Sequence, residues 1–190
     1  HGRTFGAMSL TASKAVQKKR FSPLLPDVLH THYPYFYRDI FNSATPDDCA
    51  EKSLDYIKNY LFKMMTDPEE VAAIVIEPVQ GEGGYVVPPA RFMKGLRDLA
   101  SQYGILIIAD EVQAGVGRTG KMWASDHFDG FTPDIICLAK GIASGLPLGA
   151  FMANENIMDW PPGTHATTFG GNPVSCAAAK GYTSKRGLNN

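Results

Sequence analysis

The chain contains three short apolar runs, at residues 71–76, 105–109 and 135–138, which are rich in isoleucine and lie close to glycine or proline. Runs of this length and composition are typical of strands buried on both faces of a parallel sheet. Between the first two runs, residues 89–102 place apolar side chains at helical spacing, and Gly104 follows as a stop signal. The order strand, helix, strand, connection, strand predicts an α/β fold, with a mainly parallel sheet and helices on both of its faces.

Further segments extend this fold on both sides. A capping threonine, a proline and two acids form a helix start, and the apolar pattern that follows predicts an amphipathic helix over residues 46–65, packed on the sheet. Residues 1–44 are interrupted by prolines and glycines and are predicted to be mostly loop. Residues 148–153 are predicted to form another strand, and a helix is predicted to start at Pro173.

Each of the three apolar runs leads to a charged residue. Glu77 follows the first run, Asp110 the second and Lys140 the third. Because open α/β sheets bind ligands at the carboxyl ends of their strands, these side chains are expected to face one crevice. From spacing alone, Lys140 suits a phosphate clamp, a general base or a covalent nucleophile, and a structural ion pair with Asp110 is the alternative.

A possible phosphate site precedes the last predicted helix. Residues 163–172 combine hydroxyl side chains with glycines immediately before Pro173. Backbone and hydroxyl donors at the N-terminus of a helix suit a phosphate group, so this segment is a candidate phosphate contact.

Composition narrows the range of partners. The net charge of −1 gives no electrostatic reason to expect nucleic acid or a membrane surface, and no apolar run approaches the roughly 20 residues needed to span a bilayer. The three cysteines are widely spaced, which argues against a disulfide framework and a zinc site and suits a reducing compartment. A cytoplasmic location is therefore expected; the mitochondrial matrix is the alternative, because the chain does not begin with methionine.

Seven motifs occur in the order in which they occur in one enzyme family. They are HGRT (1–4), EPVQGEGG (77–84), ADEVQ (109–113), GRTG (117–120), PDI…AKG (133–141), GLPLGA (145–150) and TTFGGNP (167–173). Together they resemble the class III, or ω-, aminotransferases, which depend on pyridoxal 5′-phosphate. The resemblance implies the large domain of a fold-type I transferase. Residues 1–179 would be its central part and residues 180–190 an atypical polar tail, with the small N- and C-terminal domain parts absent.

The resemblance assigns roles to five residues at the cofactor. Lys140 matches the lysine that forms a Schiff base with the cofactor and moves a proton during transfer. Asp110 matches the carboxylate that pairs with the pyridinium nitrogen and keeps the ring an electron sink. Val112 would pack on one ring face, and Gln113 would hydrogen-bond the phenolic oxygen. Thr168 matches a hydroxyl that reaches the cofactor phosphate of the neighbouring subunit, which implies a homodimer or higher oligomer.

Three further residues are assigned to substrate binding or support. Arg3 matches an arginine that holds a substrate carboxylate, a group that suits the guanidinium fork; a surface ion pair is the alternative. Glu82 matches a carboxylate that pairs with an arginine from the C-terminal part of related chains. Glu77 is expected to support the hydrogen-bond network behind Gln113.

The reaction that the resemblance implies is amino transfer. An ω-amino acid would donate its amino group to a 2-oxo acid such as 2-oxoglutarate, and the motifs HGRT and EPVQGEGG favour 4-aminobutyrate as the donor. Acetylornithine, ornithine and β-alanine-type donors are alternatives, as is a pyridoxal-phosphate-dependent amino-acid racemase that uses the same lysine. A different class of function is a truncated, inactive remnant that keeps only a dimerisation surface.

Overall fold

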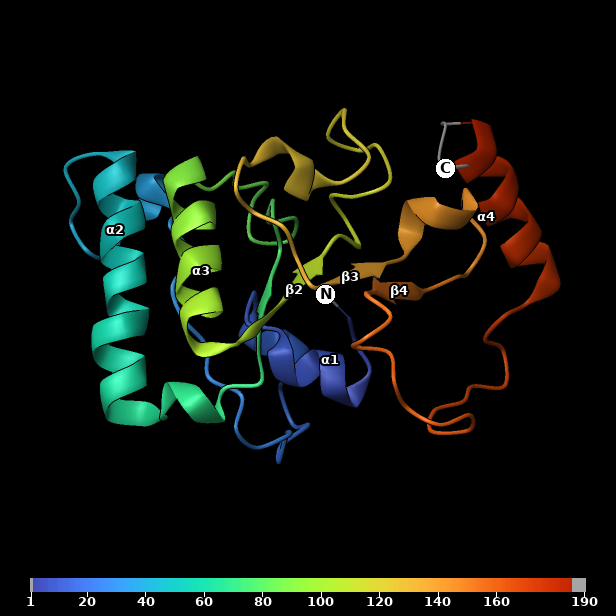
Figure 1. The fold of residues 1–190 in the computed structure, drawn as a ribbon, viewed down its shortest axis with the longest axis horizontal. Helices are drawn as coiled ribbons and strands as arrows, with labels where there is room; N and C mark the ends of the chain where they lie inside the picture. Colours follow the sequence, from blue (N-terminus) through green and yellow to red (C-terminus); the bar gives the residue numbers. More distant parts are fainter. Residues whose placement is uncertain (1, 186–190) are drawn as a thin grey trace.

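The computed structural model describes residues 2–185, with the side chains of residues 2–184 (Figure 1). Its strands are β1 (Ala73–Ile76), β2 (Leu106–Asp110), β3 (Ile135–Leu138) and β4 (Ala150–Ala153). They lie in the order β1-β2-β3-β4; the first three run parallel and β4 runs antiparallel to β3. The predicted α/β fold with a mainly parallel sheet is confirmed, and each strand lies within two residues of its predicted bounds.

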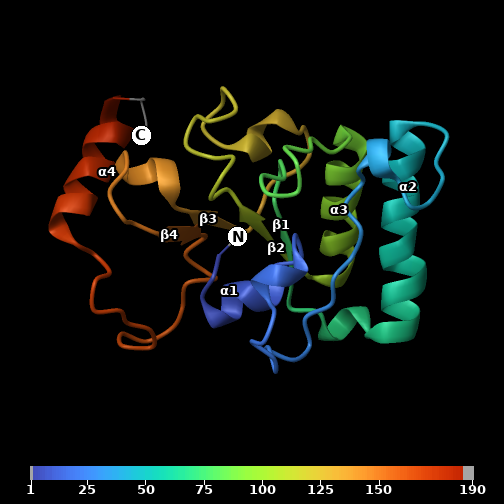
Figure 2. The ribbon, with the colours of Figure 1, turned by 180° about the vertical axis from the view of Figure 1, so that it is seen from behind.

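The larger helices occupy the two ends of the molecule. The helices are α1 (Phe5–Leu10), η1 (Ala15–Gln17), η2 (Phe36–Arg38), α2 (Pro46–Tyr56), η3 (Ile57–Met65), η4 (Pro68–Glu70), α3 (Ala90–Tyr103), η5 (Ala124–His127), η6 (Lys140–Ala143) and α4 (Pro173–Lys185). The views from front and back agree that α3 lies between α2 and the strands, with α4 at the opposite end (Figures 1 and 2). The helix predicted at Pro173 is confirmed, and it packs against η6.

Helix α3 forms as the sequence pattern predicts. It ends at Gly104, whose φ of 69° is a left-handed conformation that glycine adopts without steric cost. Met93 and Leu96 are fully buried on one face of the helix and belong to the same core as Ile107 of β2. Each such side chain stabilises the fold by about 2 kcal/mol when it is removed from water, so α3 is fixed firmly on the sheet.

The prediction for residues 46–65 is wrong in two respects. Thr45 caps α2 as expected, because its hydroxyl accepts a 3.1 Å hydrogen bond from the Asp48 amide. The α-helix stops at Tyr56, however, and the wider π-helical segment η3 continues from there. In addition, α2 packs against α3 and forms an outer layer. The apolar face of α2 is therefore covered by a helix and not by the sheet.

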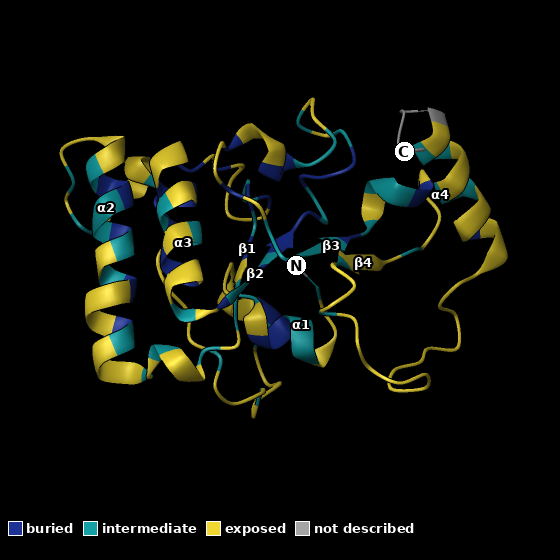
Figure 3. Cartoon of the chain, in the orientation of Figure 1, coloured by how far each residue is buried: buried dark blue, intermediate teal, exposed yellow. Residues whose placement is uncertain are grey.

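Burial of the sheet is uneven (Figure 3). Strand β2 contains the fully buried Ile107 and Ala109, as expected for a central strand. Most residues of β1 and β3 are only half buried, and Val75 of β1 is exposed, so the prediction that all three runs are buried on both faces is wrong for these two strands. Strand β4 lies at the edge of the sheet and is largely exposed.

Two negative findings apply to residues 2–185. None of the helices there combines the length and apolar character needed to cross a bilayer. In the same part of the chain, no group of histidine, cysteine or acidic side chains is arranged to hold a metal ion. The cysteines Cys49, Cys137 and Cys176 are free thiols.

Replacing Arg97 with methionine is expected to lower the free energy of unfolding by about 2 kcal/mol. Arg97 Nη1 lies 2.6 Å from Asp134 Oδ2, and the two side chains are 17% and 25% exposed. The same carboxylate oxygen accepts the Ile107 amide, so Arg97 joins α3 to the start of the strands. Loss of the guanidinium leaves Asp134 partly buried without its cation, and denaturant unfolding measures the effect.

Lys94→Met is the matched control. Lys94 also pairs with an acid at 2.6 Å, but its side chain and that of Asp98 are 60% and 61% exposed. Exposed pairs contribute about 0.5 kcal/mol because water screens them. If both variants lowered the free energy of unfolding by the same amount, Arg97 would have no special part in the fold.

Candidate active site

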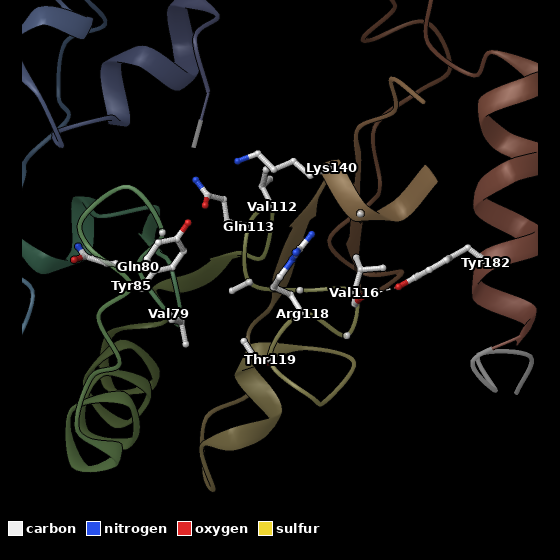
Figure 4. A pocket seen from close by; sticks show the side chains of 15 residues that line it. Val79, Gln80, Tyr85, Val112, Gln113, Val116, Arg118, Thr119, Lys140 and Tyr182 are labelled. Atoms are coloured by element: carbon white, nitrogen blue, oxygen red, sulfur yellow. Dashed lines mark hydrogen bonds between the residues drawn. The ribbon is translucent and has the colours of Figure 1, made fainter. Parts of the chain in front are cut away.

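A cavity of about 500 Å³ lies where the parallel strands end (Figure 4). The loop after β1 supplies Val79–Gly81 and Tyr85, the loop after β2 supplies residues 112–119, and Lys140 and Gly141 follow β3. Tyr182 of α4 completes the lining, and its hydroxyl donates a 3.1 Å hydrogen bond to the Val116 carbonyl. The site is therefore located at the carboxyl edge of the sheet, as the sequence predicts.

Tyr182 falls within the segment predicted to be an atypical polar tail, residues 180–190. The structure continues α4 through this boundary to Lys185, so the first residues of the segment are helical and one of them lines the cavity. Residues 186–190 lie outside the described part of the chain.

Three non-glycine residues in the cavity lining have left-handed backbone conformations. The φ angles are 57° for Tyr85, 59° for Val116 and 49° for Lys140. Such conformations cost on the order of 1 kcal/mol each and persist only where the surrounding structure holds them. Of the seven described non-glycine residues with positive φ, three lie in this lining, and residues held in this way are frequent at ligand sites.

Lys140 stands at the rim of this cavity as the first residue of η6. In Figure 4 its amine extends above Val112 toward the side chain of Gln113. Partial desolvation lowers the pKa of Lys140, and the carboxylates of Glu82, Asp110 and Glu77 oppose this shift in that order. The residue remains solvent-exposed, so the amine is reachable by a small molecule.

Asp110 lies deeper than the lysine. It is the last residue of β2, only 5% exposed, and its Oδ1 accepts a 3.1 Å hydrogen bond from the Val112 amide. Val112 and Gln113 line the cavity, whereas Asp110 is not among the described residues that line it. The carboxylate lies next to the wall residue Val112, and its charge opposes the lowering of the Lys140 pKa.

Glu77 organises the loop after β1. Its Oε2 accepts a 2.7 Å hydrogen bond from the Gly81 amide, and its carbonyl accepts a bond from the Tyr33 hydroxyl. Burial raises the pKa of Glu77; the Gly81 amide lowers it, and the charge of Asp110 raises it further. Gly81 packs so closely on the Gln113 amide that a methyl group would overlap it. Glu77 thus connects to Gln113 through Gly81.

Besides Asp110 and Glu77, three predicted residues do not line the cavity in the described part of the chain. Arg3 is exposed just before α1, and Thr168 is exposed in the turn before α4. Glu82 is exposed on the loop after β1, where its Oε2 lies 3.7 Å from Lys14 Nζ. Their predicted roles depend on a substrate, on another subunit or on an arginine from elsewhere, and they stay predictions.

Glu111 is a residue that the sequence reasoning missed. It is fully buried beside Asp110 and accepts hydrogen bonds from Ala124 and Ser125. The signal was present in the sequence: successive side chains of an extended chain point in opposite directions, so two neighbouring acids after a strand cannot both face the crevice. One of them must turn into the protein, and a buried carboxylate requires hydrogen-bond donors there.

Comparison with solved structures first defines the class of protein. An amine transaminase from an uncultivated Pseudomonas species, in its pyridoxal-phosphate-bound form, superposes with a TM-score of 0.89 at 34% identity, covering 99% of this chain and 44% of that one. An (S)-enantioselective ω-transaminase from Thermomicrobium roseum gives a TM-score of 0.88 at 33% identity, covering 99% and 42%. The fold is thus that of the pyridoxal-phosphate-dependent transaminases.

The family follows from the sequence. Residues 1–183 match the model of the family described as aminotransferase class-III, and the chain belongs to this family. The family consists of enzymes that use pyridoxal 5′-phosphate, as the sequence motifs predict.

Relatives with different activities are similar to the chain at nearly the same level. An alanine/serine racemase from Pyrococcus horikoshii is 43% identical over 95% of this chain. An acetylornithine aminotransferase from Methanopyrus kandleri and a 4-aminobutyrate aminotransferase from Mycobacterium leprae are each 42% identical over 94%. The chain spans 38–40% of the length of these three relatives. Similarity therefore establishes the family but does not choose among these reactions.

Proposed function

We propose that the protein transfers an amino group from an ω-amino acid, with 4-aminobutyrate as the favoured donor, to a 2-oxo acid such as 2-oxoglutarate. The observation that carries the cofactor chemistry is the placement of Lys140 at the cavity rim with the buried Asp110 next to the wall residue Val112, and the motifs HGRT and EPVQGEGG support 4-aminobutyrate as the donor. Acetylornithine or ornithine transfer and amino-acid racemisation are the alternatives, and each uses the same lysine.

The residues around the cavity fit pyridoxal 5′-phosphate. The volume of about 500 Å³ falls in the range of small-molecule sites, and the lining combines apolar surface with a few polar groups. Lys140 would hold the aldehyde carbon, Asp110 the ring nitrogen, Val112 one ring face and Gln113 the phenolic oxygen. Thr168 of a second copy would contact the phosphate, so we propose that the functional unit is a homodimer or a higher oligomer.

When bound, pyridoxal phosphate supplies an electron sink for the negative charge left on the substrate carbon after proton loss. The Lys140 amine can accept that proton once it is neutral, and the cavity lowers its pKa and so increases its neutral fraction. Asp110 would hold a proton on the ring nitrogen by electrostatic attraction. Val112 would cover one face of the ring.

Substrate contacts form a separate part of the proposal. We propose that Arg3 binds a substrate carboxylate and that Glu82 pairs with an arginine when an ω-amine occupies the site. The ion pair between Glu82 and Lys14 is exposed, so an incoming arginine can replace it at small cost. We also propose a cytoplasmic location, which the three free thiols support.

Incubation of the protein with pyridoxal phosphate, 4-aminobutyrate and 2-oxoglutarate tests the main proposal. Glutamate is the expected product, formed faster than with acetylornithine as the donor. Racemisation of a chiral amino acid without any glutamate would contradict the transferase proposal. Failure of borohydride to fix pyridoxal phosphate to the protein would instead support the inactive remnant.

The rate of adduct formation at Lys140 is expected to rise with pH and to reach half its maximum below pH 10.4, about the pKa of an ordinary lysine. Only the neutral amine attacks an aldehyde, and desolvation makes this amine neutral at lower pH. Stopped-flow absorbance with pyridoxal phosphate at a series of pH values measures the midpoint. A midpoint at or above that of free lysine would show that the cavity does not activate Lys140.

Gly81→Ala is expected to weaken pyridoxal phosphate binding by about tenfold, equivalent to one hydrogen bond, with little change in stability. The new methyl group would displace the Gln113 amide, which is the flexible end of a side chain, so the fold can accommodate the change. Equilibrium titration of the cofactor measures the effect. Gly6→Ala is the matched control, because a methyl group there would make ordinary contact with Leu25 at 3.8 Å; equal affinities in the two variants would exclude a role for Gln113.

A further inference from the structure

The Glu111 carboxylate is fully buried, although the three donors that it accepts from carry no formal charge. Its Oε1 accepts the Ser125 amide at 2.8 Å and the Ser125 hydroxyl at 2.7 Å, and its Oε2 accepts the Ala124 amide at 2.9 Å. A carboxylate removed from water requires such donors, and bonds to a charged acceptor are roughly twice as strong as neutral ones. The Glu111 carboxylate therefore holds the backbone of residues 124 and 125 firmly in place.

These hydrogen bonds join the two ends of a loop. Strand β2 ends at Asp110, and after Glu111 the chain forms the loop of residues 112–123, which leads into η5 at Ala124. The first part of this loop, residues 112–119, forms one wall of the cavity. Glu111 thus joins the end of the loop to its beginning.

The backbone of Glu111 binds the first residues of the same loop. Its carbonyl accepts a 2.9 Å hydrogen bond from the Gly115 amide, and its own amide donates to the Cys137 carbonyl of β3 at 3.0 Å. A methyl group on Gly115 would come within 2.8 Å of Glu111, so these two residues are in tight contact. Next to Gly115 is Val116, whose φ of 59° must be maintained by its surroundings.

We propose that Glu111 is a positioning residue that closes the loop of residues 112–123 and thereby holds Val112, Gln113 and Val116 in the cavity wall. The consequence for pyridoxal phosphate rests on the proposed function, whereas the closure of the loop does not. The role requires an acceptor with no donor of its own. A glutamine would place an amide NH₂ against a backbone N–H or the Ser125 hydroxyl and lose part of the closure.

The test compares Glu111→Gln with the unmodified protein by amide hydrogen exchange and by pyridoxal phosphate titration. Exchange of amides in residues 112–125 is expected to accelerate by about tenfold or more, with unchanged exchange in α2 and α3, because loss of a bond to a charged group has this size. The dissociation constant for pyridoxal phosphate is expected to rise about tenfold. Asp98→Asn, a change of the same chemistry at an exposed residue of α3, is expected to alter neither.

Ser125→Ala provides a milder variant if Glu111→Gln does not fold. It removes the hydroxyl bond and keeps both backbone donors, so a smaller acceleration of about threefold, confined to the same loop, is expected. Unchanged exchange in the loop of a folded variant would overturn the proposal. Equal acceleration in α2 and α3 would also overturn it, since Glu111 would then stabilise the fold in general. Lack of cofactor binding by the unmodified protein would contradict only the proposed function.

Discussion

Lys140→Ala is expected to reduce amino transfer by about 10³-fold or more and to abolish the adduct that borohydride fixes. The side chain is the proposed covalent contact to the cofactor and the proposed base, and loss of a general base alone costs about 10²- to 10⁴-fold. Glutamate formation and peptide mapping after reduction measure the two effects. The residue is exposed at the cavity rim, so the variant should fold normally.

Lys63→Ala serves as the control for this variant. Lys63 is exposed on η3, away from the cavity lining, and its loss should leave both the rate and the adduct unchanged. An adduct that persists in Lys140→Ala would show that another amine carries the cofactor, and the assignment of Lys140 would be wrong.

Asp110→Asn is expected to lower the turnover number by about 10²- to 10³-fold, the usual cost of removing one electrostatic contact to a developing charge. Asparagine keeps an oxygen that can accept the Val112 amide, so the end of β2 should remain in place. It removes the negative charge that would hold a proton on the ring nitrogen. The absorption spectrum of the bound cofactor should shift together with the turnover number.

Asp129→Asn is the corresponding control, because Asp129 is exposed in the turn after η5. Its turnover number should equal that of the unmodified protein. If Asp110→Asn instead binds the cofactor normally and retains its turnover number, the carboxylate is a structural acceptor for Val112 and has no part in the chemistry.

The proposed function requires contacts that lie outside the described cavity. The chain covers 38–40% of its relatives' length, and Arg3, Glu82 and Thr168 lie outside the cavity lining. An experiment that separates cofactor capture from amino transfer is therefore informative. Cofactor capture tests the proposed roles of Lys140, Asp110 and Glu111, whereas amino transfer also tests the proposed substrate contacts and the proposed second copy.

Local patterns predicted the fold well where the signal is contained in a few consecutive residues. The apolar run of residues 135–138 has the same bounds as β3, and the stop at Gly104 is where α3 ends. The prediction failed for residues 46–65 because an amphipathic pattern shows that one face of a helix is buried, but does not show which element covers that face. In the structure α3 covers that face, and the second half of the segment is a π-helix.

The sequence by itself determined which functional groups are present and at which edge of the sheet they lie. They are a lysine and two acids at the ends of parallel strands, within motifs that define the family. Those features are local, since they depend on strand direction and on the order of residues along the chain. Only the tertiary structure decided how the neighbouring acids Asp110 and Glu111 divide their roles. Asp110 accepts a hydrogen bond from the nearby Val112 amide, whereas Glu111 accepts from Ala124 and Ser125, which lie 13 and 14 residues further along the chain and reach it only through the fold.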